Sequence, residues 1–290
     1  MSFALVHAPE FIPLRDLVHR AIREDLSSGD VTSRIIVESN LHAHAFVLAR
    51  EPTLCCAAFL ANLVFEVVDP QVRIEIHSKE GEMVAQNSRM IELRGRAQSL
   101  LAGERTLLNL FGRSCGVANQ TRSYVEAAKG SMRVVDTRKT MPGMRVLDRY
   151  AVRCGGGHNH RNDLGSGILI KENHILCAGG IALAIAACRA QAPHPMRIEC
   201  EVRSLDELDQ AIDAGADIVL LDNMSDSDLA QAVQRSAGRV LLEASGGISL
   251  SRIPKLANLG IDLVSVGALT HSSSVADLSM LIESRVESSS

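Results

Sequence analysis

The stretch from Val134 to His174 reads VVDTRKTMPGMRVLDRYAVRCGGGHNHRNDLGSGILIKENH, and it decides how the rest of the chain is understood. It begins with the apolar pair Val134-Val135 and ends just after the run Ile168–Ile170. Short β-branched runs of this kind are typical of strands that are buried on both faces of a parallel sheet. The stretch therefore predicts two parallel strands with a long connection between them.

The connection between the two strands is strongly cationic. From Arg138 to Lys171 the sequence has seven Lys or Arg residues against two acids, a local balance of +5 in a chain whose net charge is −4. The basic and ring side chains and the glycines of this segment are Arg138, Lys139, Arg145, Arg149, Arg153, Gly155–Gly157, His158, His160, Arg161 and Lys171. Cationic loops at the ends of parallel strands predict a site for a small, multiply anionic ligand. A solvated basic face is the alternative.

The composition limits the classes of function. The chain has 290 residues, of which 46% are hydrophobic and 22% charged, so it is long enough for one large or two moderate domains. Only 3% are aromatic and Trp is absent, which together with the negative net charge argues against nucleic-acid binding. No apolar run approaches the roughly 18 residues of a membrane span, and no signal-peptide pattern occurs. The seven cysteines form no C-x-x-C pair and indicate reduced core thiols, so we expect a cytoplasmic protein.

The N-terminal third predicts a small α+β domain. Apolar residues from Leu14 to Leu26 recur at helical spacing, and residues 41–50, 72–77 and 90–94 suggest strands, with a helix near 54–68. Residues 99–129 predict two helices broken near Gly112–Gly116. In the first of these helices, Glu104 and Arg105 interrupt an apolar surface. Either they pair locally, or Arg105 reaches into a site, even across a subunit boundary.

After Gly130 the sequence alternates regularly between strands and helices. Candidate strands end at Asp136, Lys171, Val202, Asp222, Ser245 and Gly267, and helical segments such as 204–214, 225–236 and 250–259 lie between the later ones. Repeated βα units of this kind predict a parallel barrel, or an open parallel sheet covered by helices. The chemistry of such folds collects at the carboxyl ends of the strands.

The residues at those strand ends point to phosphate and carboxylate chemistry. They are Arg138, Lys139, Lys171, Glu201, Asp222, Ser245-Gly246-Gly247 and Gly267. The two glycine turns that close the last two strands can bring backbone N–H groups onto a phosphate, helped by a helix N-terminus. Glycine also occurs in turns for a positive φ alone, but two such turns on successive final strands favour a phosphate site.

These residues lie within motifs that resemble the quinolinate phosphoribosyltransferases, the nicotinate-nucleotide pyrophosphorylases of de novo NAD synthesis. The matching stretches are REDLSSGDVTS (23–33), ERTLLNLFGRSCGVA (104–118), DTRKTMPGMR (136–145), YAVRCGGGHNHR (150–161), ILIKENHI (168–175), ECEVRSLDELDQAIDAGADIVLLDNM (199–224), LEASGGI (242–248) and VSVGALTHS (264–272). They follow one another over nearly the whole chain, so the resemblance is specific. It implies an N-terminal α/β sandwich domain over residues 1–112, joined by the C-terminal segment 271–290, and an incomplete α/β barrel over residues 113–270.

The resemblance also implies an activity and its site. The enzyme would be a pentosyltransferase that joins quinolinate to phosphoribosyl pyrophosphate with loss of CO₂, using Mg²⁺, and it would form a head-to-tail homodimer. Quinolinate would meet Arg138, His160, Arg161 and Lys171, and also Arg105 of the partner subunit. Phosphoribosyl pyrophosphate would meet Lys139, Lys171, Glu201, Asp222, Ser245, Gly246, Gly247 and Gly267. Among these, Lys139, Glu201 and Asp222 would be catalytic, and Glu201 and Asp222 would hold Mg²⁺, directly or indirectly.

The sequence departs from the family pattern at a few positions. After the His160-Arg161 pair the family usually has Gly and Asp, in the pattern H-R-x-G-L-x-D, whereas this chain has Asp163 and Ser166 at those two positions. Ser27 stands where Gly is common. A carboxylate two residues from Arg161 could reshape the quinolinate pocket. This leaves open a paralogue with an altered substrate, such as the type associated with molybdenum utilisation.

Three other classes of protein share parts of the pattern. A barrel lyase would use Lys139 or Lys171 as a Schiff-base amine. A metal protein would be built on His158-x-His160, although the glycine loop supplies no further ligand. A non-catalytic binding protein would have no need of carboxylates at two strand ends.

Overall fold

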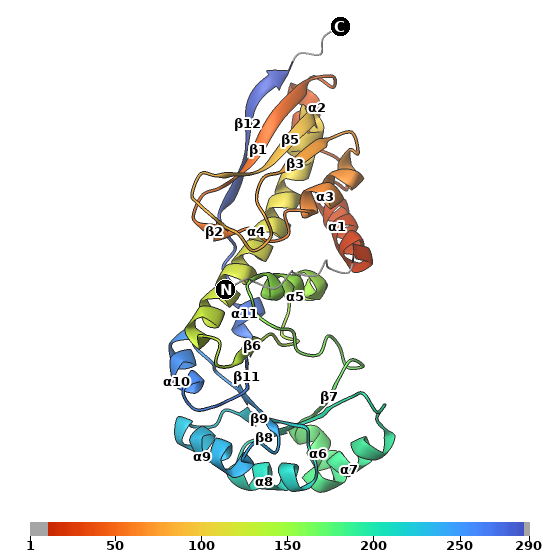
Figure 1. Ribbon diagram of the computed structural model, residues 1–290. Helices are drawn as coiled ribbons and strands as arrows, with labels where there is room; N and C mark the ends of the chain where they lie inside the picture. Colours follow the sequence, from red (N-terminus) through yellow and green to blue (C-terminus); the bar gives the residue numbers. More distant parts are fainter. Residues whose placement is uncertain (1–10, 287–290) are drawn as a thin grey trace. The chain divides into compact units, whose positions relative to one another are not determined.

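The computed structural model describes residues 11–286, and the chain divides into two compact units (Figure 1). The first unit comprises the residues up to Gln120, the segment Met141–Gly156 and the residues from Ser272 onward. The second comprises Thr121–Thr140 and Gly157–His271. The predicted boundary lay between residues 112 and 113. In the structure the first unit extends to residue 120 and also includes the separate segment 141–156.

The first unit is built on a four-stranded antiparallel sheet. Its strands are β1 (His42–Ala49), β3 (Arg73–Ile76), β5 (Arg89–Arg96) and β12 (Leu278–Val286), in the order β12-β1-β5-β3. The C-terminal strand β12 pairs with β1, so the two ends of the chain contribute to one sheet. A short ribbon of β2 (Thr53–Leu54) and β4 (Met83–Val84) lies apart from it. The predicted strands near 41–50, 72–77 and 90–94 are confirmed.

Helices cover this sheet through apolar faces. The predicted N-terminal helix is α1 (Phe11–Asp25), which buries Leu14, Leu17, Val18 and Ile22 at helical spacing and packs against α3 (Leu60–Val68). Between them, α2 (Val31–Ile36) begins at Asp30, whose carboxylate accepts a hydrogen bond from the Ser33 amide at 3.0 Å. The helix predicted near 54–68 therefore starts later than expected, because residues 53–54 form β2.

The prediction of two helices between residues 99 and 129 is wrong. A single helix, α4 (Ala97–Ala128), runs through both glycines. A Cβ at Gly116 would lie 1.8 Å from the Ser274 carbonyl oxygen, and one at Gly112 would lie 2.9 Å from that of Ala276. The Ala276 amide also donates to the Gly112 carbonyl at 3.0 Å. These glycines let a neighbouring backbone approach the helix, which offsets the roughly 1 kcal/mol that each glycine costs a helix.

The prediction that Arg145, Arg149 and Arg153 belong to cationic loops at the strand ends is also wrong. They lie four residues apart on α5 (Arg145–Cys154), a helix of the first unit. Buried Asp148 on this helix makes a bidentate pair with Arg113, both N–O distances being 2.8 Å. The helix is held in the first unit by such contacts, so its arginines belong to a different structural context from Arg138 and Lys171.

The second unit is a six-stranded parallel sheet in the order β6-β11-β10-β9-β8-β7. The strands are β6 (Arg133–Val135), β7 (Ile168–Ile170), β8 (Ile198–Val202), β9 (Ile218–Asp222), β10 (Leu241–Ser245) and β11 (Leu263–Ser265). All neighbouring strands pair in parallel, with β6 and β7 at the two edges. The predicted incomplete parallel barrel beside an α/β sandwich is confirmed.

Helices follow these strands along the chain. They are α6 (Glu172–Ala178), α7 (Ile181–Gln191), α8 (Leu205–Asp213), α9 (Asp226–Ser236), the short turn η1 (Leu250–Arg252), α10 (Ile253–Ala257) and α11 (Ala268–His271). Of these, α6, α7, α8 and α9 lie along the outer side of the curved sheet (Figure 1). Ser204 and Ser225 cap α8 and α9 by accepting hydrogen bonds from amides three residues on. The sequence had predicted these helical segments between the later strands.

No single helix among residues 11–286 is long and apolar enough to cross a membrane. The bent pair α6 and α7 passes that test of length and composition only when the two helices are taken together, and they meet at an angle of 88°.

Candidate active site

The carboxyl edge of the parallel sheet surrounds a cavity of about 200 Å³ within the second unit. The side chains of a strand alternate between its two faces, so residues two apart share the inner face. The residues that line the cavity are Thr137, Arg138, Lys139, His160, Arg161, Leu169, Lys171, Glu201, Leu220, Asp222, Glu243, Ser245 and Ser265. The structure thus brings together, from six strands and their loops, most of the side chains that the sequence singled out.

Two guanidinium groups, those of Arg138 and Arg161, line the cationic side of the cavity. Burial, and then the nearby charge of Arg138, lower the pKa of Arg161. Arg161 also donates from Nη1 to the Gly167 carbonyl oxygen at 3.2 Å. Two like charges held this close to one cavity favour a ligand with two negative charges.

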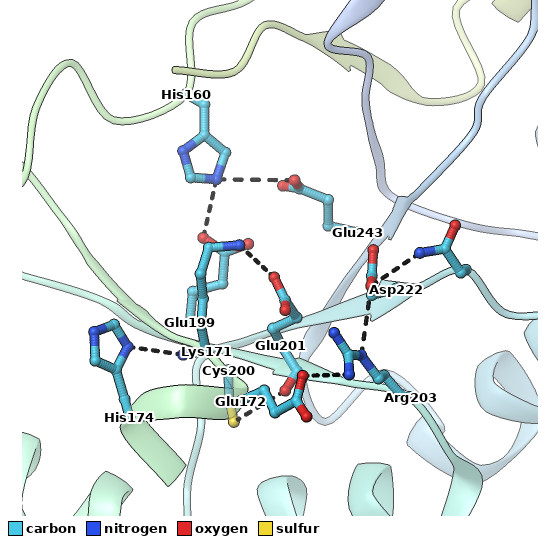
Figure 2. Close-up of polar contacts among 11 residues, drawn as sticks. His160, Lys171, Glu172, His174, Glu199, Cys200, Glu201, Arg203, Asp222 and Glu243 are labelled. Carbon is cyan, nitrogen blue, oxygen red and sulfur yellow. Dashed lines mark hydrogen bonds and ion pairs between the residues drawn. The ribbon is translucent and has the colours of Figure 1, made fainter. Parts of the chain in front are cut away.

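The predicted carboxylates of the site are paired with cations of the chain. Lys171, which follows β7, forms an ion pair with Glu201 on β8, as Figure 2 shows. Asp222 lies 3.6 Å from Arg203, whose guanidinium also pairs with Glu172. The sequence analysis missed Arg203; its position two residues beyond Glu201 was the available signal. The site is therefore a set of alternating charges rather than a purely cationic pocket.

Glycine makes room for Lys139. A Cβ at Gly267 would lie 3.0 Å from Cδ of Lys139, and the Lys139 carbonyl accepts a hydrogen bond from the Thr270 hydroxyl at 2.9 Å. The turn after β10 has another requirement, because Gly246 and Gly247 adopt φ angles of +87° and +56°. These three glycines follow the strand ends but do not line the cavity, whereas Ser245 does.

Arg105 does not line this cavity. It lies on α4 in the first unit, its side chain is 64% exposed, and the nearest carboxylate oxygen, that of Glu104, is 3.9 Å away. In the single chain Arg105 therefore lies near Glu104, as the local alternative predicts, and its reach into a site of a partner subunit stays a prediction. The helix turns this residue toward solvent, since its apolar neighbours Leu107 and Leu108 occupy the buried face.

The sequence analysis missed two buried acids at this site, of which Glu243 lines the cavity and Glu199 does not. Glu199 on β8 and Glu243 on β10 are 5% and 2% exposed, and each has a carboxylate oxygen close to Nε2 of His160, at 3.0 and 3.8 Å (Figure 2). Burial and the charge of Glu199 raise the pKa of Glu243 to about 7. Both acids interrupt apolar strands at positions that share the inner face of the sheet, and Glu199 lies two residues before Glu201. That spacing could have revealed them.

The rival chemistries receive little support from this geometry. The amine of Lys171 is engaged in an ion pair with Glu201, whereas a Schiff base needs an amine available for a carbonyl group. His158 is exposed, whereas His160 faces Glu199 and accepts a hydrogen bond from the Arg161 amide at Nδ1. The two histidines therefore do not form a shared metal site.

Comparison with known proteins decides the family. The family model described as "Quinolinate phosphoribosyl transferase, N-terminal domain" matches residues 30–115, and the model of the corresponding C-terminal domain matches residues 117–281. The chain belongs to the quinolinate phosphoribosyltransferase family. The resemblance read from the motifs is thereby confirmed.

Individual members of the quinolinate phosphoribosyltransferase family agree over nearly their whole length. The chain is 38% identical to the nicotinate-nucleotide pyrophosphorylase [carboxylating] of Mycobacterium leprae, covering 93% of this chain and 98% of the relative. It is 37% identical to the probable enzyme of that name from Bacillus subtilis, covering 93% of each. Among solved structures, NadC from Streptococcus pyogenes superposes with a TM-score of 0.91 at 36% identity, covering 96% of this chain and 98% of that one.

Proposed function

We propose that this chain transfers the phosphoribosyl group of phosphoribosyl pyrophosphate to quinolinate and releases pyrophosphate and CO₂, giving nicotinate mononucleotide for de novo NAD synthesis. The observation that carries this proposal is the pair of mutually repelling guanidiniums, Arg138 and Arg161, beside the carboxylates Glu201 and Asp222 in one cavity. A dicarboxylate relieves the repulsion of the pair, and ribose hydroxyls suit the carboxylates. Relatives named for this reaction, similar over most of the chain, support it.

Quinolinate binds at the cationic side of the cavity in this proposal. Arg138, Arg161 and Lys171 hold its two carboxylates, since a planar guanidinium meets a carboxylate with two parallel hydrogen bonds. His160 lines the same cavity. Arg105 of the partner subunit completes the pocket in a homodimer, and its exposed side chain is accessible for that contact.

Phosphoribosyl pyrophosphate occupies the opposite side. Lys139 and Lys171 face the pyrophosphate, and Glu201 and Asp222 face the ribose hydroxyls. The 5′-phosphate rests on the amides of Ser245, Gly246, Gly247 and Gly267. The left-handed backbone of the first two glycines supports this role, because turns of that kind can point successive N–H groups at an anion.

The carboxylates Glu201 and Asp222 fit Mg²⁺ by their chemistry. Both line the cavity, and carboxylate oxygens are the protein ligands that this hard cation prefers. When bound, Mg²⁺ would supply positive charge to the pyrophosphate. Because Lys171 and Arg203 already contact these carboxylates, the ion would share them with cations of the chain.

Positioning and electrostatics carry the reaction. As the bond from C1 of the ribose to pyrophosphate breaks, positive charge grows on the ribose next to Glu201 and Asp222, which stabilise it. Lys139 and Lys171 stabilise the pyrophosphate that takes the bonding electrons. The pyridine nitrogen forms the new bond to C1 and becomes cationic, so it can hold the electron pair left when the adjacent carboxylate departs as CO₂. A proton then replaces the carboxylate on the ring.

The setting of the enzyme is part of the proposal. All seven cysteines are free thiols, which agrees with the cytoplasm expected from the sequence. The proposal includes no nucleic-acid or membrane partner.

One assay tests the proposed function. The purified protein is incubated with quinolinate, phosphoribosyl pyrophosphate and Mg²⁺, and nicotinate mononucleotide and CO₂ are measured. With nicotinate, which lacks one carboxylate, kcat/KM should fall roughly 30- to several-thousand-fold, because leaving a half-buried arginine without its carboxylate costs on the order of 2–5 kcal/mol. Similar values for the two acids would refute the assignment. Borohydride trapping of a lysine by a carbonyl substrate would instead favour a lyase.

A further inference from the structure

Two buried acids of the site, Glu199 and Glu243, form no ion pair with a Lys or Arg among residues 11–286. Glu199 and Glu243 lie on the inner face of the curved sheet, on β8 and β10. Barrel folds usually fill this region with Val, Ile and Leu. One oxygen of each has no hydrogen-bond partner among residues 11–286. Burying a carboxylate that lacks hydrogen-bond partners lowers the stability of the fold, so the position of these two acids next to His160 calls for a functional explanation.

The ring of His160 is held from both sides by the protein. Its Nδ1 accepts a hydrogen bond from the Arg161 amide at 2.7 Å. Its Nε2 lies 3.0 Å from a carboxylate oxygen of Glu199, a contact that Figure 2 shows. An amide that donates to Nδ1 requires this nitrogen to carry no proton. The single ring proton therefore sits on Nε2 and is donated to Glu199, which describes a neutral imidazole.

The charges around His160 act against this neutral form. Burial lowers its pKa, but the hydrogen bond and charge of Glu199, followed by the charges of Glu243 and Asp136, raise it overall. A second proton on Nδ1 would set two donors face to face 2.7 Å apart. The Arg161 amide is a fixed part of the backbone and cannot turn away as a hydroxyl would, so it keeps Nδ1 without a proton.

The backbone around His160 is fixed in the same way. The buried carboxylate of Asp136 accepts hydrogen bonds from the His160 amide and from Nδ2 of Asn159, both at 2.7 Å. His158 extends this anchor by forming a parallel bridge with Val135. The Asp136 carboxylate therefore fixes the backbone at His160, and the imidazole of His160 fixes the backbone at the next residue, Arg161.

A metal ion is the other occupant that this cluster suggests, since His160, Glu199 and Glu243 bring three ligand atoms within 4.8 Å of one another. A metal on Nε2 would normally leave a proton on Nδ1, which the Arg161 amide opposes. The hydrogen-bond pattern thus fits an orienting network better than a metal centre.

We propose that His160 acts as a neutral positioning residue: Glu199, with Glu243 beside it, fixes the imidazole, and the imidazole fixes the backbone of Arg161, which sets where its guanidinium meets the anionic substrate. This proposal rests on the proposed function only for the identity of that substrate. Arg161 is the residue that touches quinolinate, and the two acids act on it through His160.

Nitrogen NMR tests the geometry without any substrate. Protein labelled with ¹⁵N-histidine is examined at pH 7, and the signals of His160 are identified by their loss in His160→Asn. The expected result is a neutral ring with its proton on Nε2 and an accepting Nδ1. An imidazolium, or a proton on Nδ1, would overturn the proposal. A chemical-shift change of His160 on addition of Zn²⁺ or Mn²⁺ alone would favour the metal centre and would also overturn it.

Paired substitutions test the consequence for quinolinate. The amide oxygen of His160→Asn can replace Nδ1 as acceptor for the Arg161 amide, whereas His160→Gln reaches toward Glu199 but loses that acceptor. We expect KM for quinolinate to rise less than fivefold in His160→Asn and more than tenfold in His160→Gln, with KM for phosphoribosyl pyrophosphate within threefold in both. A cationic role for His160 predicts equal, large losses, which would overturn the proposal.

Glu199 offers a second, independent pair. Glu199→Gln keeps an oxygen that can accept the Nε2 proton and should leave KM for quinolinate within threefold of wild type, while Glu199→Leu should raise it at least tenfold. Equal effects of the two variants in folded protein would contradict the network. His158→Asn, an exposed histidine in the same loop, is the matched control. If the wild type fails to convert quinolinate, the proposed function fails, but the NMR result still decides the geometry.

Discussion

The basic residues from Arg138 to Lys171 fall into two groups that lie in different units of the structure. Arg138, Lys139, Arg161 and Lys171 line the cavity at the carboxyl edge of the parallel sheet, whereas Arg145, Arg149 and Arg153 lie on α5 in the other unit. In the sequence the two groups are interleaved and chemically alike. The comparison teaches that cationic density along the chain does not make a site, because the four site residues are the ones whose loops lie at the carboxyl edge of the sheet.

The largest expected effect tests this division directly. Arg138→Ala should lower kcat/KM for quinolinate by roughly 30- to several-thousand-fold, because a carboxylate of the substrate loses its charged partner. Arg149→Ala on α5 is the matched control and should cost less than tenfold. Steady-state kinetics with both substrates, and circular dichroism to show that both variants fold, provide the measurement. Comparable losses for the two arginines would break the comparison.

A second test concerns how each unit treats a buried carboxylate. Burial raises the pKa of both Asp148 and Glu243, but the Arg113 guanidinium opposes this shift at Asp148, whereas the charge of Glu199 adds to it and raises the pKa of Glu243 to about 7. Between pH 4.5 and 7 the folded state keeps a proton on Glu243 that the unfolded state releases. The stability contributed by this protonated group is therefore complete below about pH 4.5 and is lost as the pH rises through 7.

Glu243→Gln should remove this pH dependence. Relative to wild type, its free energy of unfolding should be higher at pH 8 than at pH 5 by on the order of 1–3 kcal/mol. Chemical unfolding at the two pH values measures the difference, and Glu24→Gln, an exposed acid of α1, is the control. A difference of the same size in the control, or none in Glu243→Gln, would contradict the assignment.

Arg105 lies in the first unit, but the proposed function places it in the quinolinate pocket of the partner subunit. It therefore tests whether a cation outside the parallel sheet can contribute to the site. Arg105→Ala and Lys139→Ala homodimers should each be nearly inactive. Co-expressed, half of the dimers formed by random pairing are mixed, and each has one intact site, so activity should recover to about a quarter of wild type. The measurement is specific activity together with the proportion of mixed dimers. If mixed dimers form and activity stays absent, Arg105 does not act across subunits.

The smallest effect is expected at Asp163, which departs from the family pattern. Its carboxylate accepts from the Gly165 amide at 2.9 Å, and its own amide donates to the Ser166 hydroxyl at 3.0 Å. The acid is therefore engaged in its own exposed turn. Asp163→Gly should change kcat/KM for quinolinate by less than threefold, as steady-state kinetics would show. A large loss would mean that the turn orients Arg161.

Local patterns were sufficient for most elements of the fold. The regular alternation with helical segments predicted each strand of the parallel sheet, and apolar runs marked most of them, because a strand buried on both faces needs consecutive apolar residues. The glycines of α4 misled the prediction, since in sequence a glycine that breaks a helix looks the same as one that admits a neighbouring backbone. Only the crossing of residues 274–276 distinguishes the two cases.

The sequence by itself determined the order of strands and helices, the family through its motifs, and the candidate residues at the strand ends, because these depend on residues that are close along the chain. The tertiary structure alone decided that Lys171 pairs with Glu201, that Arg203 reaches Asp222, and that Glu199 and Glu243 converge on His160. Those contacts join residues 19 to 83 positions apart along the chain. Their geometry exists only once parallel pairing aligns the strands, and the charge of each group then depends on burial and on neighbours that no local pattern encodes.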